Sequence, residues 1–289
     1  MMNKPKTGEY IAALANLPKT APYHALSEEV VNIVNRCSTP DEVANLHKQL
    51  LQDLINRGRE NSFVNQFPAS IEAMYGVEVD RIETLCEKVD DEYFDLGNDL
   101  FLKDLAICSR RLLPAGAQLV EISGLPRTAS LKNGLSNFID FWRFVTFVLK
   151  GTAPLYEIHT NLSNLSDFNP EGWDRCYVRI GHLLKLNPSI KGMIGGSWFY
   201  DPEIEKISPK LAYLRQRPFE HNAKFFFANT EGIHSGALAK SDTRRRLYEE
   251  GHYIPRAYFM VWARRDLIEF STTHEHLLDT PAVALKVAD

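Results

Sequence analysis

Apolar residues recur with a helical period through the first part of the chain. Thr39, Pro40 and Glu42 are typical of a helix start, with Thr39 as the cap, Pro40 at the first position and Glu42 completing a capping box. The apolar residues that follow have i, i+3, i+4 spacing: Val43, Leu46, Leu50, Leu51 and Leu54. Residues 79–89 and 102–112 carry similar stripes. We therefore expect residues 1–115 to form a helical region.

After residue 115, short apolar runs alternate with helical stripes. The apolar runs predict strands at residues 119–122, 153–160, 190–201, 223–229 and 256–270. Helices are predicted at residues 135–150, 170–186, 202–218 and 241–250. Asn169-Pro170 marks the start of the second of these helices, and Ser241 is the expected cap of the last. The expected fold class is α/β (α+β), with a mixed β-sheet flanked by helices after the helical region. The domains would be residues 1–115 and 116–270, with a C-terminal extension at 271–289. No Gly/Ser/Pro linker separates them, so one merged domain is the alternative.

Residues 137–151, NFIDFWRFVTFVLKG, are the most apolar run. A membrane-spanning helix needs about 20 apolar residues, and this shorter run is interrupted by Asp140, Arg143 and Lys150. We predict a deeply buried helix and no membrane span. The N-terminus has no apolar segment followed by a small-residue cleavage site, so no secretory signal is expected.

Composition and charge exclude several classes of protein. The net charge of −4 disfavours a general nucleic-acid binder, because such proteins carry a basic excess. No two of the four cysteines have C-x-x-C spacing, which predicts reduced, buried thiols in a cytoplasmic protein rather than a disulfide framework: Cys37, Cys86, Cys108 and Cys176. The motifs of Rossmann dehydrogenases, P-loop NTPases, zincin proteases and α/β-hydrolases are absent.

A capped helix, a glycine and an aromatic strand follow one another near the C-terminus: Leu247-Tyr248-Glu249, Gly251, Tyr253 and Tyr258-Phe259-Met260. This order resembles the last helix and strands of the GNAT acyltransferase family. Residues 223–229 are similar to the preceding strand, and residues 207–218 to the helix after the acyl-CoA loop. Residues 190–201 look like the central strand that contacts pantetheine. The resemblance covers residues 188–266 and lies in the order of the elements.

The resemblance implies acyl transfer from a CoA or acyl-carrier-protein thioester to an amine or hydroxyl of a small molecule. Backbone N–H groups of the central strand would polarise the thioester carbonyl. Tyr248, with Tyr253 in reserve, would protonate the leaving thiolate, and His159 or Glu157 would be the base. The thioester would contact the central strand and the segment after it: Gly195, Gly196, Ser197, Tyr200, Lys206 and Lys210. No metal and no tightly bound cofactor are expected.

The chain departs from the family at its phosphate-binding loop, [RQ]-x-x-G-x-[GA]. The segment after the central strand reads DPEIEKISP, with no glycine. Its carboxylates, Asp201, Glu203 and Glu205, are expected to repel a pyrophosphate, and only Lys206 and Lys210 offset them. Backbone N–H groups at a helix start still bind pyrophosphate without glycines.

Two other functions remain open. The first is a metal-dependent enzyme in which His159, His234 or His252 joins a carboxylate, Glu157 or Asp167. The second is a non-catalytic binding or scaffolding protein in which the aromatic residues are only core. The substrate, the acyl group and the oligomeric state are not predicted.

Four local features complete the expectations. Gly195-Gly196 indicates a bulge or a close backbone approach within a strand. The polar loop at residues 161–172 follows a strand, where α/β sheets bind ligands. Solvated charges are predicted for Arg244, Arg245 and Arg246, and for Arg264 and Arg265 at the end of the last strand. An exposed tail is predicted to hold His274 and His276.

Overall fold

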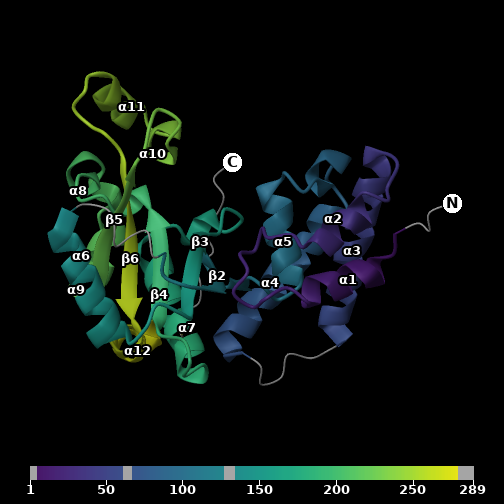
Figure 1. The fold of residues 1–289 in the computed structure, drawn as a ribbon, viewed down its shortest axis with the longest axis horizontal. Coiled ribbons are helices and arrows are strands. Elements are labelled where there is room, and N and C mark those ends of the chain that lie inside the picture. The colour runs from purple at the N-terminus through teal and green to yellow at the C-terminus, as the bar shows by residue number, and fades with distance from the viewer. Residues whose placement is uncertain (1–4, 61–66, 127–133, 279–289) are drawn as a thin grey trace. The chain divides into compact units, whose positions relative to one another are not determined.

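A computed structural model describes residues 5–60, 67–126 and 134–278 (Figure 1). The chain is a mixed α/β protein, as expected. It divides into two compact units, each described by itself. Unit 1 comprises Met1–Ala115 and Leu119–Ile122, and unit 2 comprises Gly116–Gln118 and Ser123–Asp289.

Unit 1 consists of helices with one short pair of strands. The helices are α1 (Thr7–Ala15), α2 (Glu28–Val34), α3 (Pro40–Glu60), α4 (Ala69–Cys86), α5 (Asp99–Cys108) and the 3-10 turn η1 (Asp91–Phe94). Strands β1 (Leu113–Pro114) and β2 (Gln118–Ser123) pair antiparallel. A core of aliphatic and aromatic side chains fills the space between the helices, and Leu50, Ile82 and Phe101 are fully buried in it.

The predicted start of α3 is confirmed. The hydroxyl of Thr39 accepts the N–H of Glu42 at 3.2 Å, and the carboxylate of Glu42 accepts the N–H of Ser38 at 2.7 Å. The helix continues through Gly58 to Glu60. A glycine within a helix costs only about 1 kcal/mol, so Gly58 alone does not end it.

Unit 2 is built on four strands in the order β3 (Leu155–Thr160), β4 (Gly192–Ser197), β6 (Arg256–Ala263) and β5 (Lys224–Thr230). Strands β3 and β4 are parallel, and the other two pairs are antiparallel. The parallel pair is connected by α7 (Pro170–Leu186), which begins at the predicted residue with Asn169 as its cap. Unit 2 therefore contains a βαβ unit extended by an antiparallel pair.

Helices flank this sheet. They are α6 (Gly134–Arg143), the π-helix η3 (Phe144–Leu149), α8 (Ile204–Ile207), α9 (Tyr213–Glu220), α10 (Gly236–Ala239), α11 (Asp242–Glu249) and α12 (Arg264–Thr273). The short turns are η4 (Leu165–Asp167), η5 (Trp198–Tyr200), η6 (Pro209–Leu211) and η7 (Glu275–Leu278). Trp173 of α7 and Trp262 of β6 are among the largest fully buried side chains.

The predicted strand at 256–270 is wrong in its second half. Strand β6 ends at Ala263, and α12 begins at the next residue. The N–H of Arg264 donates to the carbonyl of Lys191 at 2.9 Å, so the chain changes from strand to helix without a turn residue. His274 is half-buried rather than in an exposed tail, and its ring centre lies 4.1 Å from that of Phe270. Residues 279–289 lie outside the described residues.

Helix α6 and the π-helix bury only one face. Phe141, Phe144, Val145 and Leu149 lie in a core cluster, so the inner face is buried as predicted. The outer face is exposed, with exposed fractions of 75% at Leu135 and 74% at Phe147, and there the prediction of a deeply buried helix is wrong. Among the described residues, no helix has the length and apolar character needed to cross a membrane.

The four thiols differ in their exposure, which predicts different reactivities. Cys37 is half-buried, and the other three are buried. Burial raises the pKa of Cys86 to about 11 and that of Cys176 to about 12, so these thiols stay protonated near pH 8, and only the thiolate reacts. We expect DTNB to modify one thiol quickly in the native protein and all four in denaturant. Cys37→Ser should remove the fast reaction, and a second fast native thiol would contradict the prediction.

Candidate functional site

The ladder between the parallel strands β3 and β4 stops before either strand ends. Tyr156 pairs with Met193 and Glu157 with Ile194, whereas the strands continue to Thr160 and Ser197. On its other edge β4 stays paired with β6 up to Ser197. The β3-facing backbone groups of residues 195–197 are therefore outside the ladder. Carboxyl ends of parallel strands are where α/β sheets bind ligands.

Gly195 marks a close approach rather than a bulge. The register of β4 against β6 is continuous through both glycines, so the bulge is absent, and the register shift in this sheet lies in β5 at Phe227/Asn229. A Cβ atom at Gly195 would lie 2.8 Å from Cγ1 of Ile158 and 2.9 Å from the hydroxyl oxygen of Tyr200. Glycine is therefore required here, and the buried hydroxyl of Tyr200 lies over the face of β4 at this residue.

Aromatic side chains from two loops meet at the ends of these strands. Phe168 follows β3 and Phe199 follows β4, and their ring centres are 5.6 Å apart. The hydroxyl of Ser197 accepts the N–H of Phe199 at 3.1 Å. The buried side chain of Asn161 donates to the carbonyl of Gly116 at 3.2 Å and fixes the start of the loop at 161–172. The structure thus joins the two segments that the sequence indicated separately, and no pattern in the sequence indicates the contact of Phe168 with Phe199.

Glu157 and His159 lie two residues apart on β3 and share one face of the strand. Both are partly exposed. Taken by itself, unit 2 brings no three His, Cys, Asp or Glu side chains within ligand distance of one another among its described residues. His234 and His252 belong to the loops before α10 and after α11. A carboxylate oxygen of Glu157 and a ring nitrogen of His159 lie within 4.8 Å of each other, so these two side chains are close enough to act together.

Tyr248 and Tyr253 pack together in a small helical cap made by α8, α10 and α11. Both contact an apolar cluster that contains Ile204 and Leu238. Tyr248 is half-buried. Tyr253 is buried, burial raises the pKa of its phenol, and its hydroxyl has no hydrogen-bond partner among the described residues. The tyrosine beside Gly195 is Tyr200 rather than either of these.

Arg244 is buried, which corrects the prediction of three solvated arginines. Ser241 caps α11 as expected and accepts the N–H of Arg244 at 3.3 Å. The guanidinium donates to the carbonyl of Ala237 at 2.5 Å and to the hydroxyl of Ser208 at 2.8 Å. It lies 4.8 Å from the ring centre of Trp198, a cation–π contact. Arg246 is exposed, as predicted.

The three carboxylates after β4 each have an arginine neighbour. Asp201 is fully buried and accepts from the N–H of Arg256 at 3.2 Å and from its guanidinium at 3.0 Å. Glu203 lies 3.9 Å from Arg256, and Glu205 lies 3.2 Å from Arg215. Their negative charge is therefore largely offset within unit 2, and the expected repulsion of a pyrophosphate by these groups is weakened.

The two lysines predicted as phosphate ligands are both exposed. Lys206 lies 3.5 Å from a carboxylate oxygen of Glu203. Neither lysine is held towards the carboxyl ends of β3 and β4 by a contact within the described residues.

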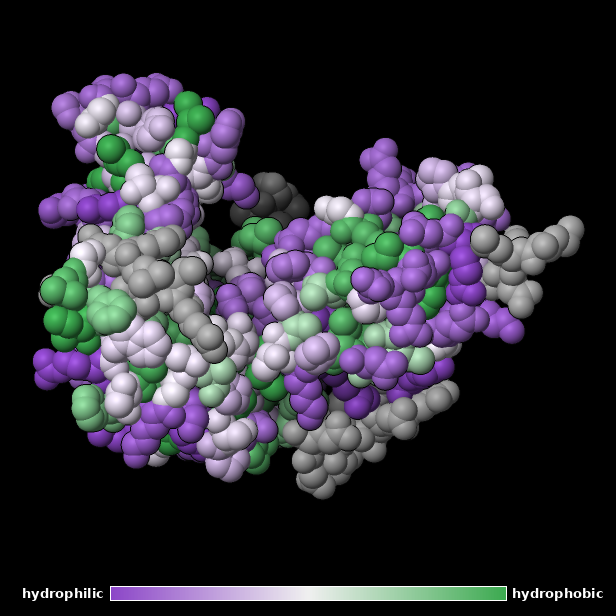
Figure 2. All heavy atoms as spheres, viewed as in Figure 1, coloured by the Kyte–Doolittle hydropathy of each residue, from purple (hydrophilic) through white to green (hydrophobic). Residues whose placement is uncertain are grey.

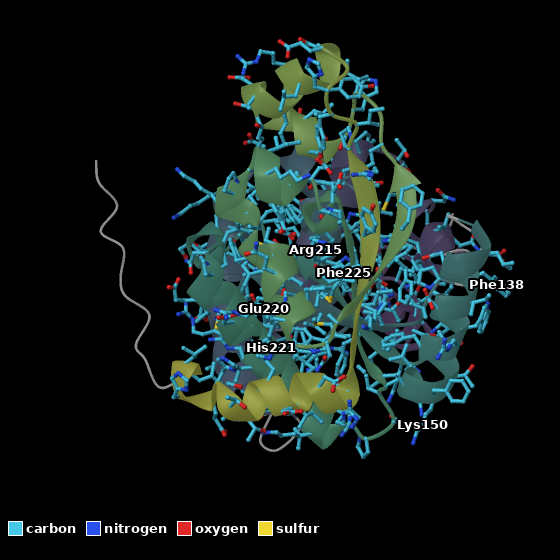
Figure 3. All side chains as sticks on the ribbon, turned by 90° about the vertical axis from the view of Figure 1, so that its left-hand side faces the viewer. Phe138, Lys150, Arg215, Glu220, His221 and Phe225 are labelled. Atoms are coloured by element: carbon cyan, nitrogen blue, oxygen red, sulfur yellow. The ribbon has the colours of Figure 1, made fainter. Side chains whose placement is uncertain are left out.

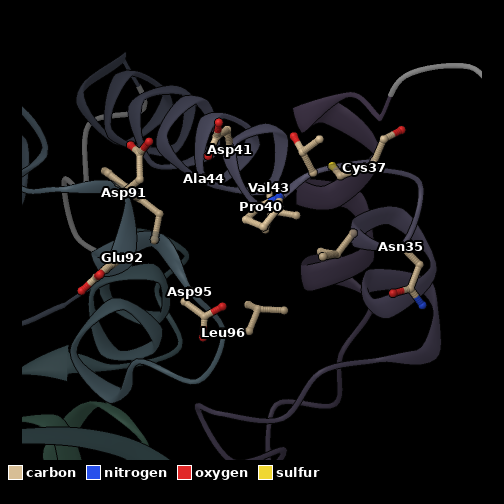
Figure 4. A pocket seen from close by; sticks show the side chains of 14 residues that line it. Asn35, Cys37, Pro40, Asp41, Val43, Ala44, Asp91, Glu92, Asp95 and Leu96 are labelled. Atoms are coloured by element: carbon tan, nitrogen blue, oxygen red, sulfur yellow. The ribbon is translucent and has the colours of Figure 1, made fainter.

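Unit 1 has a cavity of its own, which contains none of the predicted site residues (Figure 4). Its volume is about 790 Å³, which is within the range of small-ligand pockets. Apolar side chains such as Val43 and Phe94 line it together with four carboxylates: Asp41, Asp91, Glu92 and Asp95. Two segments distant in the sequence form this cavity, so no local pattern indicates it.

The geometry of unit 2 thus defines one candidate site, at the carboxyl ends of β3 and β4, with Gly195, Tyr200, His159 and Phe199 around it. Comparisons with known proteins do not add to it: no protein-family model, no curated protein and no solved structure matches the chain.

Proposed function

We propose that unit 2 transfers an acyl group from a CoA or acyl-carrier thioester to an amine or hydroxyl of a small molecule. The early end of the β3–β4 ladder carries this proposal, because among the described residues of unit 2 it leaves one edge of β4 at residues 195–197 without a partner strand. The amides of a pantetheine arm would pair with that edge as a short strand does. The thioester carbonyl would then accept a hydrogen bond from a backbone N–H.

The reaction needs two further groups. The attacking amine or hydroxyl loses a proton as its bond to the carbonyl carbon forms, and His159 or Glu157 would accept it. The tetrahedral oxyanion would be stabilised by the N–H groups of β4 until the carbon–sulfur bond breaks. The thiolate then takes a proton, which the hydroxyl of Tyr200 beside Gly195 would donate. Burial raises the pKa of Tyr200, so this hydroxyl is protonated at neutral pH. Tyr248 and Tyr253 remain the donors expected from the resemblance.

The pyrophosphate of CoA would bind at the loop between β3 and α7. Helix α7 has 17 residues, and the start of a long helix favours anions. Arg175 and Arg179 lie one turn apart on α7, and Arg175 is 2.8 Å from the carboxylate of Asp167 in that loop. Arg175 and Arg179 adjoin this loop, whereas Lys206 and Lys210 are exposed on the segment after β4.

Calorimetric titration with acetyl-, octanoyl- and palmitoyl-CoA tests the proposal. We expect saturable binding of at least one thioester and a matching rise in melting temperature. Phe199→Ala should weaken that binding about tenfold, because a partly exposed ring at the site is lost. Phe219→Ala is the matched control: this ring is 59% exposed on α9, outside the site, and its loss should leave the affinity unchanged.

Two outcomes would contradict the proposal. Absence of binding by every thioester would favour the scaffolding alternative. Equal loss of affinity in the two phenylalanine variants would place the binding site away from the carboxyl ends of β3 and β4.

A further inference from the structure

The outer face of α6 and the π-helix is apolar and open to solvent. Its exposed fractions are 75% at Leu135, 39% at Phe138, 47% at Ile139, 74% at Phe147 and 45% at Val148. Figure 2 shows hydrophobic residues gathered along the edge of unit 2 where α6 lies. A contiguous apolar face of this kind marks an interaction site on most proteins. We call these five residues the apolar face.

The apolar face is held rigidly by the core beneath it. On the inner side of the same helices, Phe141 and Phe144 pack on Phe226 of β5, with ring centres 5.1 and 5.8 Å apart. The segment therefore has large apolar side chains on both sides, and among the described residues of unit 2 only those on the inner side have a packing partner. Exposed apolar side chains gathered on one face indicate that this face also has a partner.

A basic cavity adjoins the apolar face. Its volume is about 430 Å³, and Phe147 and Val148 line it together with four cations: Lys150, Lys191, Arg264 and Arg265. Figure 3 shows Phe138 and Lys150 on the same side of unit 2. The cavity thus combines two exposed apolar side chains with enough positive charge to bind a phosphate group.

The two lysines are the cations available to a ligand. Arg265 binds Asp266, which also lines the cavity, through two hydrogen bonds of 3.0 and 2.9 Å. Arg264 donates to the carbonyls of Asn187 and Ile190 at 2.8 and 3.3 Å. Lys150 and Lys191 form no ion pair with any described residue.

The remaining charges on the outer side of α6 cancel. Asp140 and Arg143 are both exposed there, one negative and one positive. The net charge next to the apolar face therefore comes from the cavity, and it is positive.

We propose that the apolar face and the basic cavity dock unit 2 on a membrane surface that contains anionic phospholipids. The helices would lie in the plane of the interface with their apolar side chains between the headgroups. Lys150 and Lys191 would bind a lipid phosphate in the cavity. A membrane fits better than a protein partner because these side chains project from helices beside a cation-lined cavity, rather than lining an apolar groove. The proposal goes beyond acyl transfer and does not depend on it.

Co-sedimentation of the full chain with vesicles tests this. We expect binding to phosphatidylcholine vesicles that contain phosphatidylserine, little binding to pure phosphatidylcholine, and release by salt. Lys150→Ala with Lys191→Ala should weaken binding about 25-fold, since each lysine near an anionic surface contributes about fivefold. Phe147→Ala with Val148→Ala should weaken it by more than about tenfold.

Matched double variants on other surfaces of unit 2 serve as controls. Lys224→Ala with Lys240→Ala removes two exposed lysines, and Ile233→Ala with Ile254→Ala truncates two exposed isoleucines. Both controls should bind vesicles as the unmodified chain does. Absence of vesicle binding, or equal losses in test and control variants, would overturn the proposal. A dimer in sedimentation that dissociates on Phe147→Ala would also overturn it and assign the face to a second copy of the chain.

Discussion

Replacing Gly181 by alanine is expected to lower the free energy of unfolding of unit 2 by about 3 kcal/mol. Gly181 lies in α7, where an added Cβ would come within 2.2 Å of the Cβ of Ser271 and 2.5 Å of its hydroxyl oxygen in α12. The carbonyl of Leu267 would be 3.3 Å away. Both helices would have to separate, and overpacking of a well-packed interface costs about 1–3 kcal/mol or more. Urea unfolding followed by tryptophan fluorescence measures the effect.

The effect has a control and a rescue. Gly76→Ala makes the same substitution within helix α4, at a position where nothing lies within 4 Å of the added atom, and it should stabilise the protein by about 0.5–1 kcal/mol. Ser271→Gly removes the clashing atoms, so combining it with Gly181→Ala should recover most of the lost stability. A Gly181→Ala variant as stable as the unmodified protein would show that α7 and α12 are not this close.

The second large effect is expected at Asp201. Asp201→Ala should lower the free energy of unfolding by about 3 kcal/mol. The carboxylate that is lost is fully buried, and it accepts hydrogen bonds from Arg256 and from the N–H of Glu203. The value is at the low end for breaking a buried pair, since the side chain of Arg256 is 37% exposed and can turn to water. Chemical unfolding at constant pH would measure the loss.

Glu205→Ala is the matched control for Asp201. It removes the carboxylate that pairs with Arg215, in a pair whose side chains are 30% and 19% exposed. Partly exposed pairs contribute about 1 kcal/mol or less, so this variant should be the milder one. A loss for Glu205→Ala as large as that for Asp201→Ala would contradict the role of burial.

The sequence predicted the elements best where a local signal marked their ends. Asn169-Pro170 and Ser241 set the starts of α7 and α11, and both caps form as expected. Thr39 and Glu42 did the same for α3. These signals depend only on residues within one helical turn, so they can be read without knowledge of tertiary contacts.

The boundary between β6 and α12 was missed because nothing local marks it. Residues 256–270 contain no glycine or proline, and apolar residues continue on both sides of Arg264, Arg265 and Asp266. The change of structure is stabilised instead by a distant partner, the carbonyl of Lys191. The apolar face of α6 was missed for a related reason: an apolar stripe does not reveal how many of its sides the fold covers.

The sequence predicted the region of the candidate site but few of its contacts. Gly195 signalled a close approach, but not that Tyr200 and Ile158 are the groups approached. The sequence did not predict that Arg244 is buried and Arg246 is exposed, because their side chains have the same chemistry. They differ only in the direction in which they leave the helix. Phe168 and Phe199 are more than one element apart in the chain, and their contact depends on the parallel arrangement of β3 and β4.

The order of the strands in unit 2 has a consequence for how the protein is made. Met193 of β4 pairs with Trp262 of β6, so the central strand finds its antiparallel partner only after β5, α10 and α11 have been synthesised. Pairing between such distant segments is slow compared with the formation of local helical contacts. During synthesis the buried residues of β4, including Ile194, therefore remain accessible for longer than the helices of unit 1. We expect nascent chains that end before β6 to be the form most prone to aggregate and to need chaperones.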